Sequence, residues 1–339
     1  MTTGLVYDEA FLLHRAPYEH PEYPGRLAAI WKRLNEEGLA GRCRRVAARE
    51  ATREELRAVH TLEHIDRIAA TADLSFAQLD PDTYTSRHSA AAARLAAGGL
   101  IDLVGKVLSG DVSNGLALLR PPGHHAEADR AMGFCLFNNV AVATKAAQRA
   151  GVERIAIVDW DLHHGNGTQH TFENDPNVLY FSTHEYPFYP GTGAVREVGR
   201  GEARGRTVNV AWPPGMGDVE YLAAFDRVLL PIARAFDPQL VLVSCGFDAG
   251  AGDPLGGMRV SAAGYAALTE RVCSLAEGRA VLALEGGYEP DAISAAAAAC
   301  TAVLLGDAPP PLETGHPNAA AEHVLREVVE AQRPYWPGL

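Results

Sequence analysis

One stretch of the sequence places a short apolar run directly before charged and polar residues: Ile155-Ala-Ile-Val-Asp159-Trp-Asp161-Leu-His163-His164-Gly165-Asn166-Gly167. The apolar, largely β-branched run is typical of a buried strand. Side chains of an extended segment alternate between two faces, so Asp159, Asp161 and His163 share a face if the extended geometry continues. Two carboxylates and an imidazole on one face are half of a shell for a divalent ion. A charged loop whose side chains cap backbone groups would give the same pattern.

The same alternation of short strands and longer helices extends along most of the chain. Apolar, β-branched runs predict strands at 5–7, 115–119, 155–160, 178–182, 208–211, 240–244 and 281–284. Helical patterns lie between them at 24–37, 53–59, 89–108, 138–150, 219–235, 262–277 and 291–305. This order predicts an α/β fold with a central, mostly parallel β-sheet flanked by helices on both faces.

The unusual residues of the sequence lie just past the ends of predicted strands. They form blocks at 120–137, 161–167, 245–260 and 285–290. Open parallel sheets place their ligands at this carboxyl edge. No internal repeat is present, and no linker-like stretch precedes the prolines at 309–311. We therefore expect one domain over residues 1–339, with a last helix after those prolines.

Composition restricts the class of partner. The formal net charge of −12 argues against nucleic acid, whose binding needs a surplus of Lys and Arg. A cationic ligand such as a lysine side chain or a polyamine fits this sign better. The sequence does not indicate an oligomeric state, and a homo-oligomer is compatible with it.

The cysteines and the chain start favour a cytoplasmic enzyme. The five cysteines are scattered, with no Cys-x-x-Cys pair, which indicates a reduced interior and neither a disulfide scaffold nor a thiolate zinc site. Residues 1–10 have no basic start and no apolar run, so we expect no signal peptide. The alanine-rich stretches near 89–100 and 294–305 are too short or too interrupted to span a bilayer, so we expect no membrane partner.

The other three blocks carry residue types suited to catalysis. His124 and His125 follow a Pro-Pro-Gly turn that could present two imidazoles to a pocket, although a structural His-His pair is common. Asp253 could complete a metal set and leave open positions for water and substrate, whereas Asp248 is more simply a turn-stabilising residue. Tyr288, behind two glycines, could direct its phenol at a developing oxyanion or could simply be a packing residue.

Taken together and in this order, the motifs resemble the histone deacetylase and acetylpolyamine amidohydrolase family. Asn166 and the Glu-Gly-Gly-Tyr sequence at 285–288 are more similar to its class II members, and we expect a bacterial representative. The resemblance extends from residue 4 to residue 305. Its motifs lie at 20–26, 120–126, 133–139, 159–169, 190–193, 246–257 and 285–288.

The resemblance implies an arginase–deacetylase-type fold of three layers and a zinc ion, with Fe²⁺ as the alternative, held by Asp161, His163 and Asp253. It also implies a structural K⁺ site. The residues of this site are Asp159, Asp161, His163 and Ser182.

The resemblance also assigns the acid–base chemistry. His125 would be the main general base and acid, oriented by Asn166, and His124 would be its electrostatic neighbour, oriented by Asp159. Tyr288 would share the oxyanion with the metal.

For the substrate, the resemblance implies a narrow channel for an extended alkyl-ammonium chain, lined by Gly133, Phe134 and Tyr189. Tyr189 stands where the family usually has phenylalanine, which would make this wall more polar. Leu255 lies where dedicated polyamine deacetylases carry a glutamate, which favours acetyl-lysine or a small acetylated amine over acetylspermidine. Arg26 would line an internal cavity that receives acetate.

Other functions remain open at this point. An acetylpolyamine amidohydrolase or an acetoin-related hydrolase would use the same chemistry, because a fold does not fix its substrate. A binuclear manganese amidinohydrolase would need further acidic and histidine ligands and gives no role to His124, His125 and Tyr288. A non-catalytic binder of acetylated ligands would be expected to have lost part of the catalytic set, which is complete here.

Overall fold

Eight parallel strands form the central sheet, in the order β2-β1-β5-β10-β9-β6-β7-β8. The structure, a computed structural model, describes residues 2–312 and 315–339. The sheet strands are β1 (Thr3–Val6), β2 (Arg44–Val46), β5 (Asn114–Ala117), β6 (Ile155–Asp159), β7 (Val178–Glu185), β8 (Thr207–Trp212), β9 (Leu240–Cys245) and β10 (Ala280–Leu284). A separate antiparallel hairpin joins β3 (Phe76–Asp80) and β4 (Thr83–Ser86).

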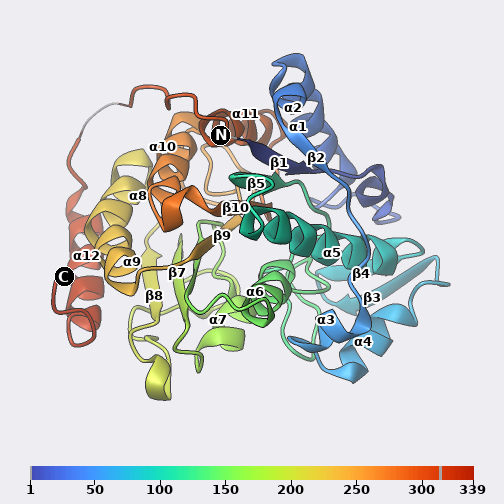
Figure 1. Cartoon of the computed structure of the whole chain (residues 1–339), viewed down its shortest axis with the longest axis horizontal. Helices are drawn as coiled ribbons and strands as arrows, with labels where there is room; N and C mark the ends of the chain where they lie inside the picture. The colour runs from blue at the N-terminus through green and yellow to red at the C-terminus, as the bar shows by residue number, and fades with distance from the viewer. Residues whose placement is uncertain (1, 313–314) are drawn as a thin grey trace.

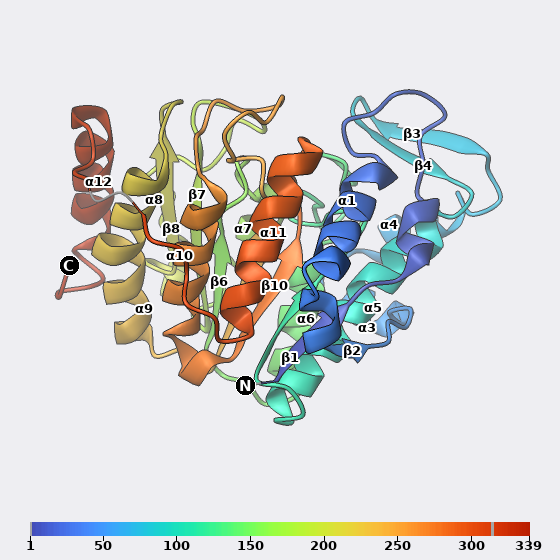
Figure 2. The ribbon, with the colours of Figure 1, turned by 90° about the horizontal axis from the view of Figure 1, so that it is seen from above.

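Helices cover both faces of the sheet and form the outer layers. Figure 2 shows α1, α8, α10 and α11 in a row along one face, while α5, α6 and α7 lie on the other. Figure 1 shows α12 beside β8 at one edge. The bounds of the helices are α1 (Pro24–Glu36), α2 (Leu39–Arg42), α3 (Arg53–Arg57), α4 (Leu62–Ala69), α5 (Ser89–Leu108), α6 (Asn139–Arg149), α7 (Asn166–Phe172), α8 (Asp218–Ala224), α9 (Leu230–Phe236), α10 (Ala262–Cys273), α11 (Pro290–Leu304) and α12 (Ala319–Gln332).

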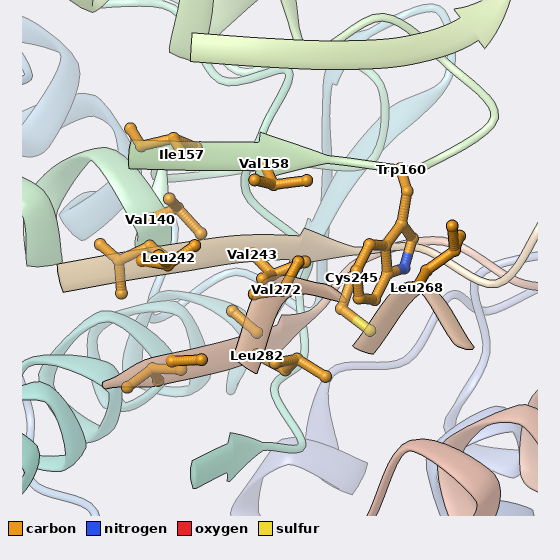
Figure 3. Packing of buried hydrophobic residues seen from close by; sticks show 14 of the residues in the cluster. Val140, Ile157, Val158, Trp160, Leu242, Val243, Cys245, Leu268, Val272 and Leu282 are labelled. Atoms are coloured by element: carbon orange, nitrogen blue, oxygen red, sulfur yellow. The ribbon is translucent and has the colours of Figure 1, made fainter. Parts of the chain in front are cut away.

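The core lies where the central strands meet these helices. Figure 3 shows side chains of β6, β9 and β10 packed with residues of α6 and α10, among them Ile157, Leu242, Leu282, Val140 and Val272. Each of these side chains is at most 1% exposed. Full burial of one such side chain stabilises the fold by about 1.5–3 kcal/mol. A sheet buried on both faces therefore holds the strand ends in fixed positions.

The predicted strands and the last helix are confirmed, with a few omissions. β2 was not predicted because Arg44 and Arg45 make this edge strand polar and leave two of its three residues exposed. The hairpin β3–β4 and the short helices α2, α4 and α7 were also missed. The helix predicted at 219–235 is divided by a π-helical turn at Phe225–Leu229.

No helix among the described residues is long and apolar enough to cross a membrane.

Candidate active site

The four sequence blocks converge because the strands that precede them are neighbours. β5, β10, β9 and β6 are adjacent in the sheet, and all run in the same direction. Their following loops, together with the turn of the β3–β4 hairpin and the loop after β7, line a cavity of about 170 Å³. It is lined by Asp82, Pro122, His124, His125, Gly133, Phe134, His163, Tyr189, Leu255, Gly286 and Tyr288.

Asp161, His163 and Asp248 form the group with metal-ligand chemistry among the residues that the structure describes. One ligand atom of each lies within 4.8 Å of the others. Nδ1 of His163 is 3.2 Å from Oδ1 of Asp161 and 3.1 Å from Oδ2 of Asp248. The remaining carboxylate oxygens accept backbone N–H groups, Asp161 from Gly286 at 2.9 Å and Asp248 from Leu162 at 2.8 Å. The chain thus fixes the carboxylates independently of one another.

This group concentrates buried negative charge. Burial and the neighbouring Asp161 carboxylate raise the pKa of Asp248 to about 7. Burial opposes the charged form of His163, but hydrogen bonds with Asp161 and Asp248 outweigh it and raise its pKa to about 10. Carboxylates this close in a buried site favour the binding of a cation.

Asp253, the third ligand implied by the resemblance, is not a member of that group. Its Oδ1 accepts the N–H of Leu255 at 2.9 Å, and its Oδ2 accepts the N–H of Tyr288 at 2.6 Å. Burial raises its pKa, with a smaller contribution from the Asp161 carboxylate. The extended geometry that would place Asp159, Asp161 and His163 on one face also ends early, because β6 ends at Asp159.

His124 and Asp159 form one hydrogen-bonded pair. Nδ1 of His124 lies 3.1 Å from Oδ2 of Asp159, which also accepts the hydroxyl of Tyr180 at 3.0 Å. Nε2 of His124 faces Asp161 at 3.7 Å. Burial opposes a charged imidazole, but the Asp161 and Asp159 carboxylates raise the pKa of His124 to about 10. His124 therefore carries positive charge in this arrangement.

His125 and Asn166 form a second pair. Nδ1 of His125 is 2.7 Å from Oδ1 of Asn166, the first residue of α7. Burial and the adjacent charges of His124 and His163 lower the pKa of His125 well below its ordinary value. His125 is therefore a neutral imidazole beside a charged one, which is the state required of a general base.

Phe134 and Gly133 shape one wall of the cavity. Both residues have a left-handed backbone, with φ of +67° and +55° respectively. A Cβ on Gly133 would collide with the ring of His125. Only glycine permits both the turn and this close approach. Tyr189 and Leu255 also line the cavity, and the ring of Tyr189 meets that of His125 edge-on at 5.1 Å.

Tyr288 lines this cavity, and Arg26 lies against its ring from outside the lining. The ring of Tyr288 packs edge-on against Phe134 at 5.9 Å, and the Arg26 guanidinium lies 4.7 Å from its centroid. Burial raises the pKa of Tyr288 well above its ordinary value, so the phenol keeps its proton. Arg26 is fully buried, bonds to Glu22 and to the carbonyl of Glu285, and is not among the residues lining the cavity.

Ser182 lies opposite Asp159 in the register of β6 and β7, so the structure brings together the residues of the implied K⁺ site. The Ser182 hydroxyl is 2.9 Å from Nδ1 of His184. Burial raises the pKa of Asp159. Both oxygens of this carboxylate are already hydrogen-bonded, Oδ1 to the N–H of Asp161 at 3.3 Å and Oδ2 to His124 and Tyr180.

Glu285 is a residue of the site whose contacts the sequence did not reveal. Its Oε2 accepts the backbone N–H groups of Gly123 at 2.5 Å and His124 at 3.2 Å. Burial raises its pKa to about 7. A side chain at the end of β10 thereby holds the loop after β5 that carries both histidines. The sequence feature that could have indicated this role is a glutamate directly after an apolar strand and before two glycines.

Comparison with known proteins identifies relatives of this chain. Residues 20–304 match the histone deacetylase domain. The chain is 47% identical to histone deacetylase 15 of Arabidopsis thaliana, across 100% of this chain and 63% of that protein. It is 46% identical to histone deacetylase 7 of Homo sapiens, across 99% of this chain and 40% of that protein. The chain therefore spans less than two thirds of the length of either relative.

A solved structure shares the fold. The crystal structure of the HDA15 HD domain aligns with a TM-score of 0.94 at 47% identity and covers 99% of this chain and 95% of that one. The fold is accordingly of the arginase–deacetylase type, as predicted. The relatives come from a plant and a human and give no support to the expected bacterial placement.

Proposed function

This chain belongs to the histone deacetylase domain family, and we propose that it hydrolyses the acetyl-amide bond of acetyl-lysine or of a small acetylated amine. The observation that carries the proposal is the placement of two adjacent histidines in one cavity with a cluster of buried carboxylates, His124 paired with Asp159 and His125 with Asn166. Both relatives are named histone deacetylases, so acetyl-lysine of a protein is the substrate class that we favour.

The donor set fits a zinc-type ion. Two carboxylates and an imidazole suit Zn²⁺ and also Fe²⁺. We assign the ion to Asp161, His163 and Asp253, as the resemblance implies, with Asp248 orienting His163 by its contact with Nδ1. When bound, the ion would polarise the acetyl carbonyl and acidify a water molecule.

His125 transfers the protons. His125 has its Nδ1 engaged by Asn166, so Nε2 is free to accept a proton from the attacking water. The same imidazole then protonates the leaving amine. His124, held by Asp159, keeps its positive charge beside the reaction and stabilises negative charge that develops there.

Tyr288 stabilises the oxyanion. Its phenol is protonated in this buried position and can donate a hydrogen bond as the carbonyl oxygen gains charge. Its place is fixed by the N–H of its own backbone, which Asp253 accepts, and by its packing against Phe134. A donor held in advance of the reaction lowers the barrier because it does not reorganise.

A narrow cavity selects an extended substrate. Phe134 and Tyr189 supply aromatic walls suited to an alkyl chain, and Leu255 adds an apolar residue to the lining. We retain K⁺ near Asp159 and Ser182, and acetate release past Arg26, as parts of this proposal. We also retain the cytoplasm as its location, since all five cysteines are free.

Turnover of a substrate panel tests the proposed function. Chelated and zinc-restored protein would be compared on acetyl-lysine peptides, acetylputrescine, acetylspermidine and trifluoroacetyl-lysine. We expect zinc-dependent release of the acyl group, fastest for a lysine derivative, and loss of it in His125→Ala. Faster turnover of acetylspermidine would favour the polyamine amidohydrolase, and two bound metal ions per chain would favour the manganese amidinohydrolase. The absence of hydrolysis would favour a non-catalytic binder.

A further inference from the structure

Asn166 is held by a second residue that the proposed mechanism does not use. Its amide nitrogen Nδ2 donates to Oε1 of Glu127 at 2.5 Å, and lies 3.3 Å from the backbone carbonyl of His125. Both partners are acceptors that carry no proton, so this end of the amide must be the NH₂ group. The amide oxygen must then face Nδ1 of His125, 2.7 Å away.

The orientation of the amide determines the tautomer of His125. An amide oxygen can only accept, so the hydrogen bond requires a proton on Nδ1 of His125. In the neutral imidazole this leaves Nε2 without a proton. A general base that accepts a proton at Nε2 needs this tautomer. If nothing held the amide of Asn166, it could turn its NH₂ group toward Nδ1 of His125 and favour the Nε2–H tautomer instead.

A further imidazole stabilises Glu127 in this role. Nδ1 of His170 lies 2.8 Å from the same Oε1 of Glu127. Asn166 and His170 are four residues apart on α7, so their side chains lie on the same face of the helix. Glu127 is partly buried, and although burial opposes its charge, the hydrogen bonds of His170 and Asn166 lower its pKa. His170 is half exposed and keeps this carboxylate charged near neutral pH.

We propose that Glu127 is a positioning residue that fixes the amide of Asn166 and thereby the reactive tautomer of His125. This inference rests on the proposed function only for its kinetic consequence. Glu127 is two residues from His125 on the same loop and contacts Asn166 and His170 of α7, but it is not among the residues that line the cavity. Glu127 therefore acts through Asn166 and does not touch substrate.

The direct test reads the tautomer without any substrate. Histidine side-chain ¹⁵N–¹H correlation spectra of the zinc-loaded full chain distinguish Nδ1–H from Nε2–H, with His125 assigned by comparison with His125→Gln. We expect Nδ1–H in the wild type, and a mixture of tautomers in Glu127→Ala. Glu127→Gln keeps an oxygen that can accept from Asn166, so we expect it to restore the Nδ1–H form. An unchanged spectrum in Glu127→Ala would overturn the inference, whether or not the protein hydrolyses any amide.

Kinetics provide the second readout. If the proposed function holds, Glu127→Ala should lower kcat by about 10–100-fold with little change in KM, and Glu127→Gln should recover most of the loss. In an Asn166→Ala background, Glu127→Ala should lower kcat no further. An equal additional loss in that background would mean that Glu127 acts independently of Asn166 and would contradict the proposal. Glu330→Ala, on the exposed side of α12, is the matched control and should leave spectrum, kcat and zinc content unchanged.

Discussion

Tyr288 supplies the phenol that the proposed mechanism needs at the oxyanion. In Tyr288→Phe the ring, its packing against Phe134 and its contact with Arg26 can all remain, while the hydroxyl is lost. We predict that kcat falls by roughly 10²–10³ and that KM changes little, because the hydroxyl acts chiefly on the transition state. Steady-state kinetics on an acetyl-lysine peptide measure both. A variant with the kcat of the wild type would remove Tyr288 from the mechanism.

Asp253 and Asp248 can be separated by their effects on metal binding. If Asp253 is a ligand and Asp248 orients His163, Asp253→Asn should lose zinc almost completely, whereas Asp248→Asn should weaken zinc binding by about 10–100-fold. Competition with a chromogenic chelator measures both affinities. The reverse ranking would place Asp248 in the ligand set, as its closeness to Asp161 and His163 also permits.

The residue patterns indicated chemistry that is local, and the resemblance added the distant pairs His124–Asp159 and His125–Asn166, but the distant contacts of Glu285 and Glu127 were missed. Asp161 and His163 belong to one motif, and their spacing is visible in the chain. Glu285 holds the N–H of Gly123 across 162 positions, and Glu127 contacts Asn166 across 39. Nothing in either local pattern indicates the partner, because only the order of the strands brings them together.

The backbone of the loop that carries Gly133 limits the space available to the His125 ring. Gly133→Ala would place a Cβ against the His125 ring in a backbone conformation with φ of +55°. Gly38→Ala is the matched control, because Gly38 also has a positive φ, of +72°, but no atom lies within 4 Å of the point that a Cβ would occupy there. We predict a loss of about 1–2 kcal/mol in stability for Gly38→Ala, from left-handed strain, and a larger loss for Gly133→Ala, which adds the collision with the His125 ring.

Only the variant in the active-site loop should lose activity. We predict that Gly133→Ala lowers kcat by about 10²-fold, as expected for a small misplacement of a catalytic group, while Gly38→Ala retains it. Urea unfolding and steady-state kinetics on both proteins check the two statements. Equal activity of the two variants would show that the approach of Gly133 to His125 has no role in catalysis.

At the level of secondary structure, long buried elements were predictable and short ones were not. α5 has the bounds that its pattern predicts, and the core strands carry uninterrupted apolar runs. α7 was missed because it begins within the motif at Asn166, where the residues serve the site and give no amphipathic pattern. The hairpin β3–β4 was missed because its first strand is only partly buried.

The molecule as a whole should lose stability in acid, through histidines buried in the neutral state. His60 donates from Nδ1 to the carbonyl of Glu127 and accepts the N–H of Asn138 at Nε2, so both nitrogens are occupied without a second proton. Burial, followed by the charge of His64, lowers its pKa to about 3 from an ordinary value of 6.5. Between these values the unfolded chain binds the additional proton, so the free energy of unfolding falls as pH falls through this window.

Replacing His60 tests this pH dependence. In His60→Gln the slope of stability against pH should decrease by up to about 1.4 kcal/mol per pH unit within that window, the contribution of one proton. His323→Gln, at a position 64% exposed, is the control and should keep the slope of the wild type. Urea unfolding at a series of pH values gives the slopes. An unchanged slope in His60→Gln would mean that the imidazole is protonated in the folded protein.

The parallel sheet brings together, at one edge, motifs that are far apart in the sequence. The order of its strands places β5, β10, β9 and β6 side by side, and this order is not contained in any single motif. The prediction that residues 1–339 form one domain stays a prediction, since the relatives extend beyond the length that this chain spans. The proposed catalytic roles depend on the loops that meet at this edge of the sheet.

Acetate release from an acetyl-lysine peptide by metal-free protein, before and after addition of one equivalent of zinc, tests the proposed deacetylase activity most directly. We predict no release without the ion, recovery on addition of zinc, and no recovery in Tyr288→Phe or His125→Ala beyond a small residual rate. Failure of the zinc-loaded wild-type chain to release acetate, or equal release with and without the ion, would contradict a metal-dependent deacetylase.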